Sequence, residues 1–443
     1  MAVFFAEHAL LPQGWADDVR LEIDAKGDLT AVTAHAKSQG AQKLRGPALP
    51  GMANLHSHAF QRAMAGLTDV RSAPHDDFWS WRELMYRFME RLTPAQAQAI
   101  AAQLFIEMLK HGYTAVAEFH YVHHPEEMLS RHLDAARETG IAITLLPSLY
   151  RWSGFGSKPL EPQQRRFASD VKSVLTTLEK LKVHLGPDVK SGVAPHSLRA
   201  VDPQSLKGLI AAVDEAAPIH IHAAEQTREV EECMLALGKR PVEWLLENCA
   251  VDGRWCLVHA THMAHNELVG LAASGAVAGL CPSTEANLGD GIFPLLNYRG
   301  ASGRYGIGGD SHVSRDPAEE LRLLEYVQRL VGRRRNLNIS STSPAVGTTL
   351  WLEAAAGGAQ ALGRAMGALQ VGKRADLVVL DGEAPDIAAH AGDAIANALV
   401  FSGSENLVRD VMVGGRWVVR ERRHALEEKT AERYARAVRE LIA

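Results

Sequence analysis

The sequence has few cysteines and no long apolar run. Its four cysteines among 443 residues include no CxxC pair and lack the density of a disulfide framework, which favours free thiols in a reducing cytoplasm. No apolar run approaches the ~18 residues that a membrane-spanning helix needs, so we expect no membrane segment. The first residues carry no basic leader, and Glu7 and His8 interrupt their short apolar stretch, so we expect no secretory signal.

An excess of basic charge is also missing. Lys and Arg number 47 against 52 Asp and Glu, a formal net charge of -5, which argues against nucleic acid or an anionic membrane as the main partner. The arginine runs at 333–335 and 422–423 lack interleaved aromatic residues, so we interpret them as solvated faces. A hydrophobic content of 47% with 22% charged residues is typical of a globular protein and excludes disordered and collagen-like chains.

Short apolar or β-branched runs recur between longer helical patterns from about residue 49 to 362. The eight runs are 48–58, 114–120, 141–150, 191–197, 218–225, 255–262, 276–283 and 305–312. The helical patterns at 95–112 and 126–140 both end at a glycine. Eight strands alternating with helices predict an α/β fold, a parallel (β/α)8 barrel. A doubly wound open sheet is the competing topology, but its nucleotide-binding forms lack support because no GxGxxG or GxxxxGK[ST] motif follows the early strands.

The two ends of the chain have a different pattern. Residues 19–23 alternate between apolar and polar, residues 375–380 are strand-like, and Gly414-Gly415 between two short apolar runs predicts a hairpin. Neither end holds enough apolar surface to fold alone, so we expect the two to combine into one small β-sandwich. The predicted division is a β-sandwich from 1–48 and 363–428, a barrel from 49–362, and a C-terminal helix from 429–443.

Seven of the eight predicted strands end in a hydrogen-bonding or metal-binding side chain. These residues are His56, His58, His120, Tyr121, Tyr150, His196, His222, His259 and Asp310. In a (β/α)8 barrel the active site lies at the C-terminal ends of the strands. The pattern therefore predicts a functional site at this end.

Two pairs of histidines have a spacing that suits a shared metal ion. His56 and His58 are two residues apart, so both rings point to the same face of a strand. His220 and His222 repeat the spacing, but only His222 has a glutamate, Glu225, three residues later. We therefore expect His220 to have a structural role.

A carboxylate completes the predicted donor set. Asp310 follows Gly308 and Gly309, which permit close backbone approach and leave the carboxylate accessible. Imidazole nitrogens with a carboxylate oxygen suit Zn²⁺ more than Ca²⁺ or Mg²⁺, and such an ion lowers the pKa of bound water from about 15.7 to about 7. Fe²⁺ and Mn²⁺ can share these ligands. Four further histidines are expected in loops or at helix starts: His123, His124, His262 and His265.

The segments PGMANLHSH, HIHAAEQ, LVHATH and GGDSH resemble the metal-binding strands of the amidohydrolase superfamily, in its aminohydrolase branch that uses one metal ion. More narrowly, HSHAFQRAMAG, FWSWRELMYRF, EFHYVHH, APHSLRA and HIHAAEQTREVEE are similar to the deiminases that act on N-formimino-L-glutamate in histidine degradation. The similarity extends over essentially the whole chain. It implies hydrolysis of N-formimino-L-glutamate to N-formyl-L-glutamate and ammonia. A homodimer is also expected, as is common for such barrels.

The resemblance also implies residue roles. The implied metal ligands are His56, His58, His222 and Asp310. The fourth strand carries no lysine of the kind that bridges two metals in related enzymes, so one ion is expected. Asp310 and His259 would orient and deprotonate the attacking water, and Glu225 would carry protons to the leaving nitrogen.

The two carboxylates of that substrate require cationic partners. Arginine binds a carboxylate through two parallel hydrogen bonds, and Arg199, three residues after His196, and Arg82 are the candidates. The resemblance adds polar contacts from Gln61, Tyr121 and His196. The alternative for Arg82 is a surface position on a helical loop.

The segment from residue 59 to about 91 is too long for a simple connection, and such loops are usually lids or contact surfaces. Its aromatic residues Phe78, Trp79 and Trp81 would shield the site, pack against a second subunit or belong to the core. Two other functions compete with the deiminase. One is a related aminohydrolase acting on a nucleobase or another cyclic amidine, which has no use for two arginines. The other is a binding scaffold without catalysis, which the complete ligand set and Glu225 disfavour.

Overall fold

Eight parallel strands form the centre of the molecule. The computed structural model describes residues 1–71, 76–341, 343–403 and 405–443. The strands are β6 (Met52–Ser57), β7 (Tyr113–His120), β8 (Ala142–Leu149), β10 (Ala194–Pro195), β11 (Ile219–Ala223), β12 (Trp255–His259), β13 (Val277–Leu280) and β14 (Arg304–Ile307). Each lies within one of the eight predicted runs, apart from one residue at the start of β7 and one at the start of β14.

The eight strands close into a barrel. Hydrogen bonding joins β6, β7, β8 and β10 in one sheet and β11 to β14 in another, and β9 (Val189–Ser191) adds to β8. Parallel bridges connect the two sheets on both sides, at Val193 with Ile219 and at Ser57 with Asp310. The predicted (β/α)8 architecture is therefore confirmed. The second bridge places the strand that carries His56 and His58 beside Asp310.

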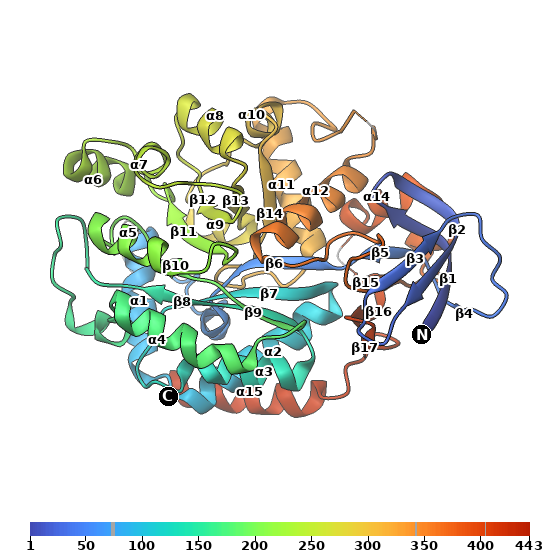
Figure 1. The fold of residues 1–443 in the computed structure, drawn as a ribbon, viewed down its shortest axis with the longest axis horizontal. Helices are drawn as coiled ribbons and strands as arrows, with labels where there is room; N and C mark the ends of the chain where they lie inside the picture. Colours follow the sequence, from blue (N-terminus) through green and yellow to red (C-terminus); the bar gives the residue numbers. More distant parts are fainter. Residues whose placement is uncertain (72–75, 342, 404) are drawn as a thin grey trace.

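Helices cover the outside of the barrel (Figure 1). The predicted helices at 95–112 and 126–140 are α2 (Pro94–Lys110) and α3 (Met128–Thr139). Thr93 caps α2 through the backbone N–H of Gln96, and α3 ends at Gly140 with φ of 80°, a conformation that favours glycine. The others are α4 (Val171–Leu181), α5 (Pro203–Ala212), α6 (Thr227–Leu237), α7 (Pro241–Asn248), α8 (His265–Ser274), α9 (Pro282–Leu288), α10 (Leu295–Gly300), α11 (Pro317–Gly332) and α12 (Val346–Ala361), with short 3-10 turns η2 (Pro162–Phe167) and η3 (Lys182–His184).

Strands from both ends of the chain form one further sheet beside the barrel, blue and red in Figure 1. The strands are β1 (Ala2–Leu11), β2 (Gly14–Ile23), β3 (Leu29–Thr33), β4 (Gln42–Lys43), β5 (Ala48–Pro50), β15 (Leu377–Leu380), β16 (Val408–Val413) and β17 (Arg416–Val419). The two ends meet where β15 pairs antiparallel with β5. Phe4, Leu21, Leu377 and Met412 share a separate small core. The two chain ends therefore combine into one small β domain, as expected of the predicted β-sandwich, and its strands belong to a single eight-stranded sheet.

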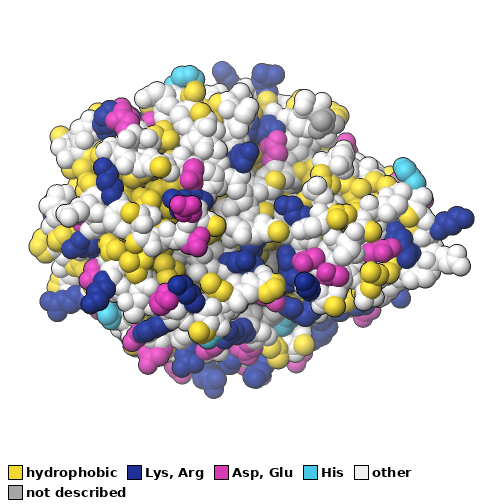
Figure 2. Space-filling model, viewed as in Figure 1, with side chains coloured by type: hydrophobic (Ala, Val, Ile, Leu, Met, Phe, Trp, Pro, Cys, Tyr) yellow, Lys and Arg dark blue, Asp and Glu magenta, His cyan; other side chains and the backbone are white. Residues whose placement is uncertain are grey.

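Three helices accompany this part of the chain: α13 (Pro385–Ala388), α14 (Asp393–Phe401) and α15 (Glu427–Ile442). The last of them packs along α2 of the barrel, where Lys110 Nζ lies 2.7 Å from Glu427 Oε2. No helix among the described residues is long and apolar enough to cross a membrane. On the face shown in Figure 2, basic and acidic side chains are interspersed.

The long segment after β6 contains a 3-10 turn and a helix. The turn is η1 (Ala59–Met64), and the helix is α1 (Phe78–Arg91), whose first turn is capped by the Asp77 carboxylate. Residues 72–75 of the predicted 59–91 segment lie outside the described residues. Phe78, Trp81 and Arg82 of α1 line the pocket at the C-terminal end of the barrel, so this helix contributes to the site rather than only connecting two strands.

Candidate metal centre and active site

Three histidines and one aspartate converge at the C-terminal end of the barrel. His222 Nε2 on β11 lies 3.1 Å from His56 Nε2 and 3.3 Å from His58 Nε2. Asp310 Oδ1, just after β14, lies 3.9 Å from His56 Nε2 and 3.7 Å from His58 Nε2. Four ligands at ~2.0–2.1 Å from one ion lie ~3.3 Å apart, so the imidazole spacing already fits a tetrahedral ion and the aspartate is within a small side-chain adjustment of it.

Backbone carbonyls determine the tautomers of two of these histidines, His58 and His222. His58 Nδ1 donates to the Phe119 carbonyl oxygen at 2.8 Å, and His222 Nδ1 donates to that of His196 at 2.9 Å. Each Nε2 therefore directs a lone pair toward the other imidazoles, because a carbonyl can only accept. Burial lowers the pKa of His58 to about 3 and that of His56 well below its ordinary value. Neutral, converging lone pairs are the arrangement that a divalent ion requires.

A second group of ionisable side chains adjoins the first. His259 Nε2 lies 3.4 Å from Asp310 Oδ2 and 3.7 Å from Glu225 Oε1, and its Nδ1 lies 3.2 Å from Glu285 Oε1. Burial alone lowers the pKa of His259, but Glu225, Glu285 and Asp310 together raise it well above its ordinary value. Burial also raises the pKa of Glu225, and that of Asp310 to about 6. The raised pKa values and the short contacts between these groups suit them to hold protons and pass them to one another.

The backbone at the strand ends is strained. Asp310 has φ of 49°, His259 of 67° and Ala224 of 53°, all in the left-handed region that residues other than glycine rarely adopt. Each such conformation costs about 1–3 kcal/mol and persists only where the surrounding structure maintains it. These positions carry or adjoin the candidate metal-binding and proton-transfer residues.

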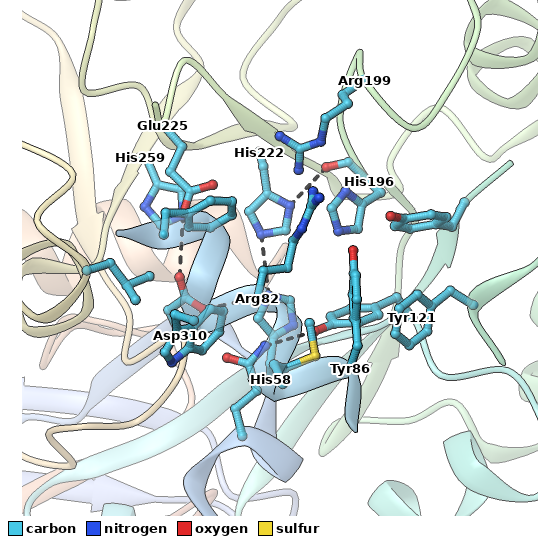
Figure 3. A pocket seen from close by; sticks show the side chains of 17 residues that line it. His58, Arg82, Tyr86, Tyr121, His196, Arg199, His222, Glu225, His259 and Asp310 are labelled. Atoms are coloured by element: carbon cyan, nitrogen blue, oxygen red, sulfur yellow. Dashed lines mark hydrogen bonds and ion pairs between the residues drawn. The ribbon is translucent and has the colours of Figure 1, made fainter. Parts of the chain in front are cut away.

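The pocket above this group contains two arginines (Figure 3). It is lined by His58, Gln61, Phe78, Trp81, Arg82, Met85, Tyr86, Tyr121, Tyr150, Phe167, His196, Arg199, His222, Glu225, His259, Leu288 and Asp310. Arg82 Nε and Nη1 and Arg199 Nε are buried without a hydrogen-bond partner in the described part of the chain. Unsatisfied buried N–H groups are costly, so these arginines are arranged for an anionic ligand.

The structure brings all the predicted site residues together. Ten of the eleven line the pocket, and His56 joins them through the metal-binding group. Gln61 Nε2 donates to the Tyr121 hydroxyl at 2.8 Å, so these two predicted contacts form one unit. The partly buried Arg82 faces the pocket, in contrast to the surface position that the sequence left open.

Three histidines outside the metal-binding group make structural hydrogen bonds to backbone carbonyls. His220 Nε2 donates to the Ala361 carbonyl at 2.8 Å, as its expected structural role requires. His262 Nε2 and His123 Nε2 likewise donate to backbone carbonyls at 2.7 Å. His120 ends β7 but is absent from the pocket lining, because its neighbours Phe119 and Tyr121 occupy the inner side of the alternating strand.

Three buried glutamates that support the site were not predicted. Glu285 on α9 contacts His259 and accepts the backbone N–H of Cys281 at 2.9 Å. Glu229 on α6 accepts the backbone N–H of Glu225 at 3.0 Å. Neither residue ends a strand, so the pattern that identified the others had no signal for them.

The third of these, Glu118 on β7, holds the strand that carries two metal-binding histidines. Its Oε2 accepts the Ser57 hydroxyl at 2.6 Å, and its Oε1 accepts the backbone N–H of Ala59 at 3.0 Å. His312 Nε2 donates to the same Ser57 oxygen at 2.8 Å. Glu118 therefore fixes the backbone on both sides of His58 and, through Ser57, connects it to the segment that follows Asp310. The letters EFH contain this residue but do not reveal its hydrogen bonds.

Comparisons with known proteins agree with this geometry. Residues 48–418 match the model of the Amidohydrolase family, and residues 1–46 match that of the Formimidoylglutamate deiminase HutF N-terminal domain. The chain therefore belongs to the amidohydrolase family. More particularly, it is 54% identical to the formimidoylglutamate deiminase of Pseudomonas aeruginosa, over 100% of both chains.

More distant similarities also extend over most of the chain. A 5-methylthioadenosine/S-adenosylhomocysteine deaminase of Natronomonas pharaonis is 28% identical over 92% of this chain and 88% of its own. Among solved structures, an amidohydrolase from Brucella melitensis superposes with a TM-score of 0.92 at 42% identity, covering 100% of both chains. An adenosine deaminase from Xanthomonas campestris with bound zinc has a TM-score of 0.81 at 20% identity and covers 98% of both chains.

Proposed function

We propose that this chain hydrolyses N-formimino-L-glutamate to N-formyl-L-glutamate and ammonia, a step of histidine degradation. The single observation that supports this most is the pair of pocket arginines with unpartnered buried N–H groups above the histidine cluster. A substrate with two carboxylates satisfies both guanidinium groups. The full-length relative at 54% identity supports the same substrate.

One divalent metal ion, Zn²⁺, is part of the proposal, with His56, His58, His222 and Asp310 as its ligands. The neutral imidazoles, the converging Nε2 atoms and the adjacent carboxylate fit this ion. When bound, the ion would lower the pKa of a water molecule and make it nucleophilic at neutral pH.

Protein side chains accept and donate the protons of the reaction. Asp310 and His259 orient the water that attacks the formimino carbon and take its proton, since they lie 3.4 Å apart beside the pocket. Glu225 has a pKa raised by burial and can carry a proton to the formimino nitrogen, which leaves as ammonia. One water is consumed, the carbon–nitrogen double bond is replaced by a carbonyl, and the glutamate nitrogen keeps its bond to that carbon.

Substrate recognition is assigned to the other side of the pocket. Arg82 and Arg199 bind the two carboxylates, and Gln61, Tyr121 and His196 supply polar contacts. The aromatic side chains around them exclude water, which strengthens each charged hydrogen bond. The Gln61 to Tyr121 hydrogen bond holds both of these side chains in place at the pocket wall.

A panel of substrates tests the function. Formimino-amino acids and nucleobases are incubated with the metal-loaded protein, and released ammonia is measured. We expect ammonia from N-formimino-L-glutamate and none from adenine, guanine or cytosine. Preference for a nucleobase would instead support the competing aminohydrolase function. A relative at 28% identity is named as a deaminase of adenosine derivatives, so this alternative belongs in the panel.

Three further features belong to this proposal. The domain limits are 1–48 with 363–428, 49–362 and 429–443.

A homodimer is supported by the exposed apolar side chains of Leu330 and Val331 on α11, a kind of surface that interfaces cover. A cytoplasmic location is supported by four buried cysteines that are all free. Light scattering tests the dimer, which a monomeric mass would exclude.

A further inference from the structure

Trp79, in the first turn of α1, is surrounded by three guanidinium groups. The distances from the ring centroid to Cζ are 4.3 Å for Arg228, 4.6 Å for Arg82 and 5.6 Å for Arg199. These arginines belong to α6, to α1 itself and to the segment after β10. One indole therefore connects α1 to two separate βα segments of the barrel, at the place where the substrate carboxylates are proposed to bind.

The arginines differ in how their charge is balanced. Arg228 Nε pairs with Glu232 Oε1 at 2.8 Å and is more than half exposed. Arg82 and Arg199 instead keep unpartnered buried N–H groups within the described residues. Burial opposes the charged form of Arg199, and the nearby carboxylates of Glu229 and Glu225 favour it. Two such cations near each other repel, and the electron-rich face of an indole offsets part of that repulsion. The indole thus keeps both guanidinium groups at the pocket without occupying their N–H groups.

Stacking also constrains orientation. A guanidinium that lies against an aromatic face keeps its N–H groups in its own plane, free for the bidentate contact that a carboxylate makes. Figure 3 shows Arg82 and Arg199 entering the pocket on the side of His222 and His196. Arg228 on α6, which already pairs with Glu232, contacts the Trp79 ring and helps to hold it in place.

We propose that Trp79 is a positioning residue that holds Arg82 and Arg199 for two substrate carboxylates and so sets the preference for substrates with two carboxylates over those with one. This inference rests on the proposed function. It also assigns a role to an aromatic residue that would otherwise only cover the pocket, pack in the core or contact a second subunit. Trp79 itself is not among the pocket-lining residues, so it acts through the arginines.

The test compares two substrates in three forms of the metal-loaded full chain: wild type, Trp79→Leu and Trp79→Phe. The substrates are N-formimino-L-glutamate and N-formimino-4-aminobutyrate, which lacks one carboxylate. We expect Trp79→Leu to raise KM for the first substrate about 10-fold with kcat little changed, and to lower the ratio of kcat/KM between the substrates by a similar factor. Trp79→Phe keeps an aromatic face and should lie between the two.

Trp417→Leu is the matched control. Trp417 on β17 stacks against Arg420, with the ring centroid 4.8 Å from Cζ, in the small β domain. Its replacement removes the same kind of contact away from the pocket and should leave the substrate ratio unchanged. Thermal unfolding and metal content accompany each assay, and if Trp79→Leu does not fold, the Trp79→Phe ratio decides.

An unchanged ratio in Trp79→Leu, or an equal loss on both substrates, overturns the role of Trp79 while leaving the function intact. If the wild type releases ammonia from neither substrate, the proposed function and this inference both fail. The two failures are therefore distinguished by the wild-type measurement alone.

Discussion

Replacing Glu118 with glutamine should weaken metal binding without touching a proposed ligand. Burial raises the pKa of Glu118 to about 8, and above that pH its carboxylate accepts the Ser57 hydroxyl through one oxygen and the Ala59 N–H through the other. A glutamine has one acceptor oxygen and one NH₂ donor. One orientation therefore sets the NH₂ against the Ala59 N–H, and the other leaves the Ser57 hydroxyl proton without its acceptor. The neighbouring backbone must then shift, and it carries His58.

The size of the effect follows from these contacts. Losing one hydrogen bond to a charged or buried acceptor costs about 1.5–3 kcal/mol, and changes in residues that hold metal ligands commonly lower metal affinity about 10- to 100-fold. Because Ser57 also accepts from His312, two residues beyond Asp310, the loss extends to the carboxylate ligand. We expect Glu118→Gln to fall in this range for zinc.

Competition with a chromophoric zinc chelator, carried out above the Glu118 pKa of about 8, measures the affinity directly. Glu353→Gln serves as the control, because Glu353 pairs with Arg299 at 2.7 Å and not with the strand that carries the histidines. Both variants should keep a cooperative thermal transition. A zinc affinity of Glu118→Gln within about twofold of both wild type and control would refute the positioning argument.

Three further outcomes follow from the same geometry. Arg82→Met and Arg199→Met should each lower kcat/KM for N-formimino-L-glutamate about 10-fold or more, since a charged hydrogen bond contributes about 1.5–3 kcal/mol; unaltered kinetics in both would exclude the recognition scheme. Exhaustive chelation with metal quantification should abolish ammonia release, and added Zn²⁺ should restore it; full activity of the metal-free protein would exclude a metal-dependent reaction. Burial raises the pKa of Glu320 from 4.5 to about 8, so its contribution to stability is complete below pH 4.5 and is lost as the pH rises toward 8. Glu320→Gln should flatten the denaturant-measured pH dependence in that interval, and an identical slope in wild type and variant would contradict this.

The barrel and its functional end could be predicted from the linear pattern. Strands buried on both faces are mostly apolar along their length, so a polar residue at the C-terminal end of nearly every strand is a clear signal, although Glu118 and His220 lie within strands. Consequently His56, His58, His222 and Asp310 stand out in the sequence, and all four lie together in the structure. The β domain could also be predicted from the sequence, because neither chain end alone holds enough apolar surface for a core and the two must therefore combine.

The residues that hold the site were decided only by tertiary packing. Glu118, Glu229 and Glu285 lie on three different elements, and each acquires its role from backbone groups that the fold brings to it. The same holds for Trp79, whose three arginine neighbours lie between 3 and 149 positions away in the chain. Periodicity records which face of an element is buried, and therefore which residues can meet at a strand end. Periodicity does not show which distant hydrogen bonds hold these residues in place, because those hydrogen bonds depend on how the strands close around the barrel.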